Sequence, residues 1–147
     1  MTAPARSLRD VDYRALAAFR TALRRFLRAS AERARALGVS PQQHQLLLAI
    51  KGHAGAEPPL MGELADALQV RPHSAVGLVD RAVTAGLARR LTLGGDRRRV
   101  GVALTAHGGR TLARLTEDNR IELAGLRELL GRVSWGRRRP LNHGGDA

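Results

Sequence analysis

The sequence contains no cysteine and few aromatic residues. Cysteine is absent from all 147 residues, and aromatic residues make up 3% of them. Without cysteine the chain has no disulfide, no thiolate metal ligand and no cysteine redox switch. The scarcity of aromatic rings argues against recognition of single-stranded RNA, which typically uses such rings as stacking platforms for the bases.

Long apolar runs are also missing. No stretch approaches the ~20 apolar residues that a membrane-spanning helix requires. The segment from Met1 to Arg9 lacks the apolar core of a signal peptide. We therefore expect a soluble, cytoplasmic protein.

Side chains that commonly build catalytic or metal sites do not come together in the sequence. The acidic residues are distributed along helix faces, and no serine or threonine has the neighbours of a nucleophile. The histidines are too scattered to form a metal site by spacing. They are His44, His53, His73, His107 and His143. We expect neither an enzyme nor a bound metal or cofactor.

What the chain has in excess is positive charge. Lys and Arg number 25 against 13 Asp and Glu, which gives a formal net charge of +12, and Lys51 is the only lysine. Such an excess indicates a polyanionic partner, although coding bias in GC-rich genomes also enriches arginine. The positions of the arginines therefore carry more information than their number.

Apolar residues recur at steps of three and four over most of the chain, which predicts a mainly helical fold. Ser40, Pro41 and Gln43 supply the cap, the first-turn proline and the capping-box partner of one helix. The polar Asn119 interrupts the spacing of the last helical region. The expected helices cover residues 11–37, 41–51, 60–70, 72–85 and 106–134.

The periodicity changes to two after Gly86. Apolar residues alternate over 87–93 and again over 100–104, with two glycines and an aspartate between the runs, so we expect a β-hairpin. The stretch "GGDRRRVGVALT" (94–105) places three consecutive arginines at the tip of this hairpin. A short helix, a tight turn, a second helix and a hairpin, in this order, predict a winged helix-turn-helix.

A winged helix-turn-helix offers one helix to the major groove, which is about 12 Å wide, and flanking basic groups to the phosphates. We expect residues 72–85 to enter the major groove and the tip at 96–99 to contact the backbone or a narrow minor groove. The residues expected to contact DNA are Arg71, Pro72, His73, Ser74, Val76, Gly77, Arg81, Asp96, Arg97, Arg98 and Arg99. Two alternatives stay open: the arginine run could be a solvated turn that guards a strand edge, and Asp96 could shape the turn without aiming Arg98.

These features resemble the MarR-type (multiple antibiotic resistance regulator) transcription factors. The wing is similar to the family pattern D-x-R-x-x-x-V-x-L-T, and "LVDR" followed by "AGL" resembles the end of the family's recognition helix. The matching positions are Asp96, Arg98, Val102, Leu104 and Thr105 in the wing, with 78–81 and 85–87 before it. The similarity covers about residues 10–118.

The resemblance implies a mainly α fold with a small β-wing and long dimerisation helices at both ends. Members of the family are homodimers that bind palindromic operators and often release them when a small molecule binds between the dimer and DNA-binding regions. The regions expected on this basis are 10–37 and 106–134 for dimerisation and 38–105 for DNA binding. The tail has no apolar period, and we expect the ends at 1–9 and 135–147 to be disordered.

The sequence departs from the family at the start of the recognition helix. Arg71 stands where a short polar cap is commoner, and Val76 and Gly77 stand where polar or basic residues are usual. Base readout is therefore expected to be sparse, with hydrogen bonds from His73 and Ser74 and packing of Val76 on a thymine methyl. The region after Leu115 is shorter than the usual pair of C-terminal helices.

The predicted function is a homodimeric, sequence-specific repressor that binds double-stranded DNA. A small aromatic or apolar effector is expected near Phe19, Phe26 and Leu47, where the first two helices should meet; the alternative is that the two phenylalanines only pack in the core or the dimer. The alternative functions are an architectural DNA binder with little sequence preference and no effector, and a winged helix that binds RNA or protein.

Overall fold

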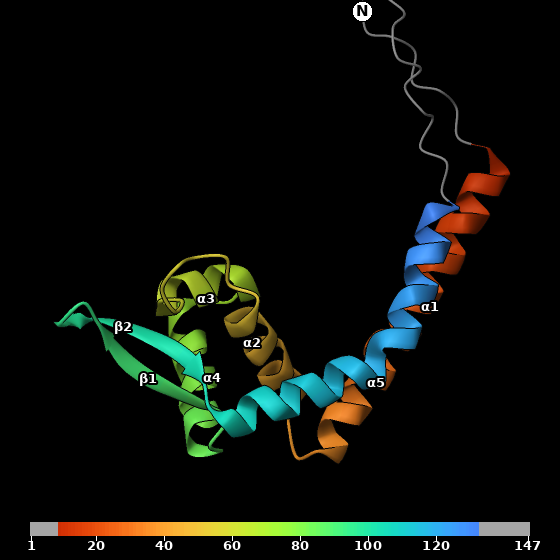
Figure 1. Ribbon diagram of the computed structural model, residues 1–147. Coiled ribbons are helices and arrows are strands. Elements are labelled where there is room, and N and C mark those ends of the chain that lie inside the picture. Colours follow the sequence, from red (N-terminus) through yellow and green to blue (C-terminus); the bar gives the residue numbers. More distant parts are fainter. Residues whose placement is uncertain (1–8, 133–147) are drawn as a thin grey trace, which may run out of the picture. The chain divides into compact units, whose positions relative to one another are not determined.

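The computed structural model describes residues 9–132 (Figure 1). The helices and strands are α1 (Asp10–Ala36), α2 (Pro41–Lys51), α3 (Met61–Leu68), α4 (Pro72–Thr84), β1 (Ala88–Leu93), β2 (Asp96–Leu104) and α5 (Ala106–Gly131). The expected class, mainly α with a two-stranded wing, is confirmed. Residues 1–8 and 135–147, expected to be disordered, lie outside the described residues.

The chain divides into two compact units, which are described separately. The winged-helix unit is Leu27–Arg120, and the helix-pair unit comprises residues 9–26 and 121–132 of the described chain. Helices α1 and α5 each contribute to both units. Within the described residues, no helix has both the length and the apolar character that crossing a membrane would need.

The start of α2 follows the capping signal in the sequence. The backbone N–H of Gln43 donates to Ser40 Oγ at 3.1 Å, and the backbone N–H of Ser40 donates to Gln43 Oε1 at 2.9 Å. These two bonds satisfy donors that the first turn of a helix leaves without intrahelical partners. The predicted capping box is confirmed.

The helix-turn-helix consists of α3 and α4. Between them Gln69 adopts a left-handed conformation with φ 55°, and Val70 then leads to Pro72 at the first turn of α4. Proline suits this position because its fixed φ matches the helix and its missing N–H is not needed there. The inner face of α4 is apolar and buried, through Ala75, Leu78, Val79 and Ala82.

The wing is an antiparallel hairpin whose turn is made by Gly94 and Gly95. Both have positive φ, 58° and 73°, as the tight turn of a two-residue hairpin requires. Thr92 pairs with Val100, but its neighbour Leu93 pairs with Asp96. Residues 97–99 of β2 therefore have no partner on β1, where Thr92 and Leu93 follow each other directly. They form a bulge, which we call the arginine bulge.

A close approach joins the end of α4 to the start of α5. The backbone N–H of Gly108 donates to Thr105 Oγ1, whose hydroxyl donates to the carbonyl of Gly86 at 2.6 Å. A Cβ at Gly108 would collide with the carbonyl oxygen of Leu87. Only glycine fits at this crossing, which fixes the first turn of α5 against the beginning of the wing.

The core of the winged-helix unit is continuous and apolar. It brings together α1, α2, α3, α4, both strands and α5 around side chains that are buried. Its members are Ala34, Val39, Leu46, Leu47, Ile50, Leu64, Leu78, Val79, Ala82, Leu87, Ala88, Val102, Leu112 and Leu115.

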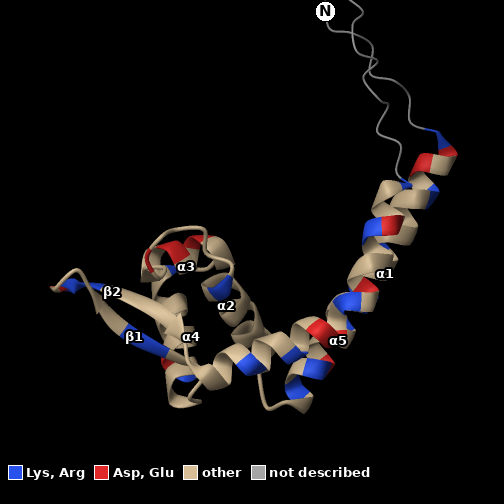
Figure 2. Ribbon diagram, in the orientation of Figure 1, with Lys and Arg blue, Asp and Glu red and all other residues tan. Residues whose placement is uncertain are grey.

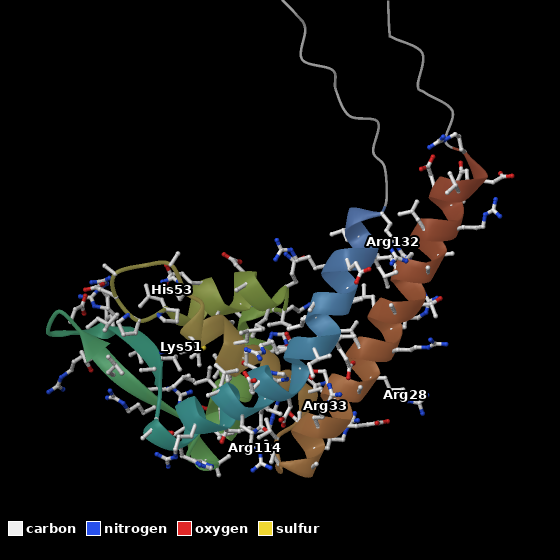
Figure 3. The ribbon with its side chains drawn as sticks, turned by 45° about the vertical axis from the view of Figure 1, so that its right-hand side comes forward. Arg28, Arg33, Lys51, His53, Arg114 and Arg132 are labelled. Carbon is white, nitrogen blue, oxygen red and sulfur yellow. The ribbon has the colours of Figure 1, made fainter. Side chains whose placement is uncertain are left out.

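Asn119 does not break the last helix. α5 is a single helix through this position, and Asn119 is buried with its amide hydrogen-bonded. Its Oδ1 accepts from Arg33 Nη1 at 2.7 Å, and its Nδ2 donates to Ser30 Oγ at 3.2 Å. Figure 3 shows Arg33 on the side of α1 that faces α5. The interruption of the apolar spacing at Asn119 therefore does not interrupt the helix, which continues to Gly131, because the polar residue finds partners on α1.

The helix-pair unit contains the first half of α1 and the last part of α5. A hollow of about 390 Å³ lies between them, lined by Arg25, Phe26, Leu126 and Leu129 among others. Large apolar side chains also face outward from this unit. They are Val11, Tyr13, Ile121, Leu123 and Leu130.

Candidate nucleic-acid interface

The outer face of α4 carries the residues expected to enter the major groove. Arg71, Pro72 and His73 are exposed at its start, and the side chain of Val76 is 41% exposed one turn later. This face lies opposite the buried residues of α4, because exposed and buried positions alternate with the period of the helix. The structure therefore leaves the first two turns of α4 accessible.

The other expected positions on α4 are also at or near the surface. Ser74 and Gly77 are half-buried, and Arg81 is exposed. The Nη1 of Arg81 lies 3.4 Å from where a Cβ of Gly77 would be, which is an ordinary contact distance.

An acidic residue on the same helix is neutralised by the wing. Asp80 accepts a hydrogen bond from Arg90 of β1 and forms an ion pair with it. A carboxylate on this face would otherwise repel a phosphate backbone. Sequence reasoning missed this pair, since the pattern "LVDR" contains the acid but does not indicate its partner on β1.

The middle residue of the arginine bulge extends into solvent. The side chain of Arg98 is 96% exposed. Asp96 Oδ1 accepts the backbone N–H of Arg98 at 2.9 Å and lies 4.0 Å from Arg98 Nε. Asp96 thus shapes the turn through the backbone and also lies at the limit of ion-pair distance from the guanidinium. Figure 2 shows basic residues at the end of the wing.

Arg99 differs from its two neighbours because it has a partner on another segment. Its Nη2 lies 2.9 Å from Oε2 of Glu57, in the segment between α2 and α3. The residues are separated by 42 positions in the chain, so this contact could not be read from local spacing.

The histidines do not form a metal centre in the described part of the chain. Within residues 9–132, no three His, Cys, Asp or Glu side chains come close enough to hold an ion. His44 is buried on α2, and burial lowers its pKa. His53 Nε2 lies 3.8 Å from Glu63 Oε2, and His73 is exposed on α4. His143 lies outside the described residues.

The three residues expected to contact an effector lie in different surroundings. Leu47 is 0% exposed in the core of the winged-helix unit. Phe26 lines the hollow of the helix-pair unit, and Phe19 is half-buried in that unit. A larger apolar groove of about 850 Å³ lies between α2 and α5 within the winged-helix unit. It includes Leu48 and Lys51, the latter labelled in Figure 3.

Comparison with known proteins identifies the relatives of this fold. The MarR family model matches residues 37–99, whereas no curated protein sequence matches the chain. RV1404 from Mycobacterium tuberculosis is 28% identical over 92% of this chain and 88% of that chain, with a TM-score of 0.64.

Two further solved structures show the same fold. AbsC, a MarR family transcriptional regulator from Streptomyces coelicolor, is 21% identical over 86% of this chain and 84% of that chain, with a TM-score of 0.64. A mutant MarR from E. coli, complexed with operator DNA, is 24% identical over 78% of this chain and 89% of that chain, with a TM-score of 0.58. The resemblance read from the sequence is confirmed.

Proposed function

Because this chain carries a MarR-family winged helix-turn-helix, we propose that it is a transcriptional regulator that binds double-stranded DNA. The observation that carries the proposal is the exposed face of α4, together with the exposed arginines of the bulge in the wing. The net charge of +12 fits a polyanionic partner, and the E. coli relative is complexed with operator DNA.

In this proposal α4 lies in the major groove. His73 and Ser74 are placed to donate to or accept from base edges, and the exposed Val76 can pack on a thymine methyl. Arg71 and Arg81, at the two ends of this face, contact phosphates and set the register of the helix. Arg97 and Arg98 reach the backbone or the minor groove from the wing.

We propose further that the protein acts as a homodimer. The helix-pair unit leaves Leu123 and Leu130 44% and 48% exposed on the same side of α5. Burying the exposed half of each side chain in a second copy stabilises by roughly half of the ~1.5–3 kcal/mol that full burial of such a side chain contributes. A two-fold axis through this interface would present two copies of α4 and so select a palindromic operator.

A repressor role with release by an effector completes the proposal. A small aromatic or apolar acid could occupy the hollow beside Phe26 and Arg25 and shift the spacing of the two DNA-reading helices. Phe19 and Leu47 belong to the predicted site too, but Leu47 is reached only if the core opens. A panel of aromatic carboxylates and phenols that changes neither Tm nor DNA affinity would remove the effector from the proposal.

The experiment that tests the main proposal is selection of bound sequences from a random pool of double-stranded DNA. A regulator should enrich a palindrome, and the selected site should outcompete random DNA by about 10³-fold or more. An architectural binder, the second candidate, is favoured by the apolar Val76 and Gly77 on the reading face. It would enrich no motif, and random DNA would compete equally well.

A further inference from the structure

We propose that Glu57 is a positioning residue that aims the wing through Arg99, so that Arg99 holds the arginine bulge instead of contacting DNA. The inference rests on the proposed DNA binding and divides the three consecutive arginines by role. Arg97 and Arg98 reach the nucleic acid, and Arg99 ties the bulge to the body of the winged-helix unit. We call the Glu57–Arg99 pair the wing brace.

The bulge needs such a support because of the register of the hairpin. Leu93 pairs with Asp96, and Thr92 pairs with Val100, so residues 97–99 lie outside the pairing that orders the strands. At the beginning of the bulge, Asp96 Oδ1 accepts the backbone N–H of Arg98. At its end, the ion pair of Arg99 with Glu57 Oε2 at 2.9 Å is the contact with another segment. The bulge is therefore tied at both ends.

The segment that carries Glu57 is itself attached to β2. The carbonyl of Pro59 accepts the backbone N–H of Val102 at 3.0 Å, and Leu60 forms an isolated bridge with Gly101. The two prolines at 58 and 59 restrict the backbone directly after Glu57. Glu57 is thus fixed relative to the part of β2 that follows the bulge.

Gly101 makes this attachment close. A Cβ at this position would lie 3.0 Å from Leu93 Cδ1 and 3.2 Å from Pro58 Cβ, tighter than ordinary contact. The glycine thus leaves room for the side chain of Leu93 and the ring of Pro58, which both approach β2 at this position. The segment before α3 therefore lies against β2 here, and the Glu57 carboxylate of that segment reaches Arg99.

The Glu57–Arg99 ion pair is too weak to matter much for folding, but it can restrict the direction of the bulge. The side chains of Arg99 and Glu57 are 47% and 54% exposed, and ion pairs of this kind contribute about 0–1 kcal/mol to stability. The pair therefore adds little to folding. Its effect lies in restricting the directions that the bulge can take, while Arg98 stays 96% exposed. On the other strand, Arg90 pairs with Asp80 of α4, so each strand of the wing has one arginine bound to the body.

The test compares Glu57→Gln, Arg99→Ala and the double variant for binding to the DNA selected above, over a range of salt concentrations. The matched control is Glu32→Gln, which removes the same charge from an exposed pair with Arg28 on α1. We expect each single variant to weaken binding about two- to fivefold, the range that a pair worth up to about 1 kcal/mol allows, and the double variant to lose no more than either. The salt slope should stay unchanged in Arg99→Ala, because no phosphate contact is lost.

A change in the salt slope of Arg99→Ala, or tighter DNA binding by Glu57→Gln, would overturn the proposal. If Arg99 contacts a phosphate, Arg99→Ala lowers the salt slope by about one unit, and Glu57→Gln strengthens binding because DNA no longer competes with the carboxylate. Binding by Glu57→Gln equal to that of the parent and of Glu32→Gln would also overturn it. Restoration of binding by the charge-swapped pair, Glu57→Arg with Arg99→Glu, supports the brace.

A measurement without DNA separates this inference from the proposed function. Trypsin cleaves after arginine, so limited proteolysis reports how firmly residues 97–99 are held in the unbound protein. We expect faster cleavage at the bulge in Glu57→Gln than in the parent or Glu32→Gln. Faster cleavage together with no DNA binding by the parent would leave the brace intact as a contact and refute the regulator. Equal cleavage in all three would refute the brace itself.

Discussion

The two units of the chain bury their apolar residues to very different extents. Among the described residues, every buried hydrophobic side chain lies between Ala34 and Leu115, inside the winged-helix unit. The helix-pair unit instead exposes large apolar residues on both helices, and Ile121 is 83% exposed. Its buried residue in the described chain is an acid, Asp12.

The difference indicates two sources of stability. The winged-helix unit has a complete core from its own sequence, so it should hold its fold without a partner. Two helices alone cannot bury a sizeable core, and contiguous apolar surface of this kind marks interaction sites. We infer that the helix-pair unit is completed by association, and that substitutions in the two units will show different dependence on protein concentration.

The largest effect is expected in the core of the winged-helix unit. Leu47→Ala removes a fully buried side chain and should lower the free energy of unfolding by about 2–5 kcal/mol. The neighbouring Leu48→Ala is the matched control, because Leu48 is 49% exposed and should cost much less. Chemical denaturation of both variants measures the difference. Equal losses would mean that Leu47 is not a core residue and would revive it as a surface contact for an effector.

The second effect concerns the helix-pair unit. Leu123→Glu places a charge on its exposed apolar side and should weaken the proposed dimer at least about tenfold, or 1.4 kcal/mol. Ala124→Glu adds the same charge to the adjacent exposed position and serves as the control. Sedimentation over a range of concentrations measures both. If parent and variants are all monomers at micromolar concentration, with Tm independent of concentration, the association is refuted.

A smaller effect comes from the ionisable group in the winged-helix core. Burial lowers the pKa of His44 from 6.5, so the unfolded chain binds the proton more readily than the folded chain. The contribution to stability is present above pH 6.5 and is lost as the pH falls from there through the lowered pKa of the folded state. His44→Gln should flatten this part of the stability curve. If the free energies of unfolding of variant and parent change in parallel with pH, the pKa of His44 is the same in the folded and unfolded chains.

The elements that could be predicted from the sequence are those set by local signals. The capping box at Ser40 and Gln43 fixes the start of α2, and the glycine pair at 94–95 fixes the hairpin turn. The outward face of α4 follows from its apolar period, so its exposed positions could be placed without the structure. These signals act over a few residues and therefore survive in a single sequence.

The contacts that were not predicted connect distant segments. The Glu57–Arg99 and Asp80–Arg90 pairs depend on the path of the wing over the body, and so does the three-residue bulge that carries the arginines. Asn119 interrupted the apolar period, yet its partners Ser30 and Arg33 lie almost ninety residues earlier, as the separations of 89 and 86 show. Pattern reasoning has no access to such pairs. The close approach at Gly108 had only a weak signal in the sequence, namely a glycine three residues after a threonine that can cap a helix.

The smallest expected effect on stability is that of Arg98→Ala, because this side chain belongs to neither the core nor the exposed apolar surface. Its side chain is 96% exposed, so the free energy of unfolding should change by no more than about 0.5 kcal/mol and the association state should not change.

DNA binding by Arg98→Ala should nevertheless weaken. A phosphate contact predicts an equal loss for all sequences and a salt slope lower by about one unit, whereas insertion into the minor groove predicts a larger loss at A·T-rich sites. Arg71→Ala, at the entrance of α4, is the comparison for a phosphate contact alone. If Arg98→Ala binds as tightly as the parent at about 0.15 M salt, where charges more than ~8 Å apart are largely screened, the arginine bulge is a solvated turn and Arg98 does not probe the DNA.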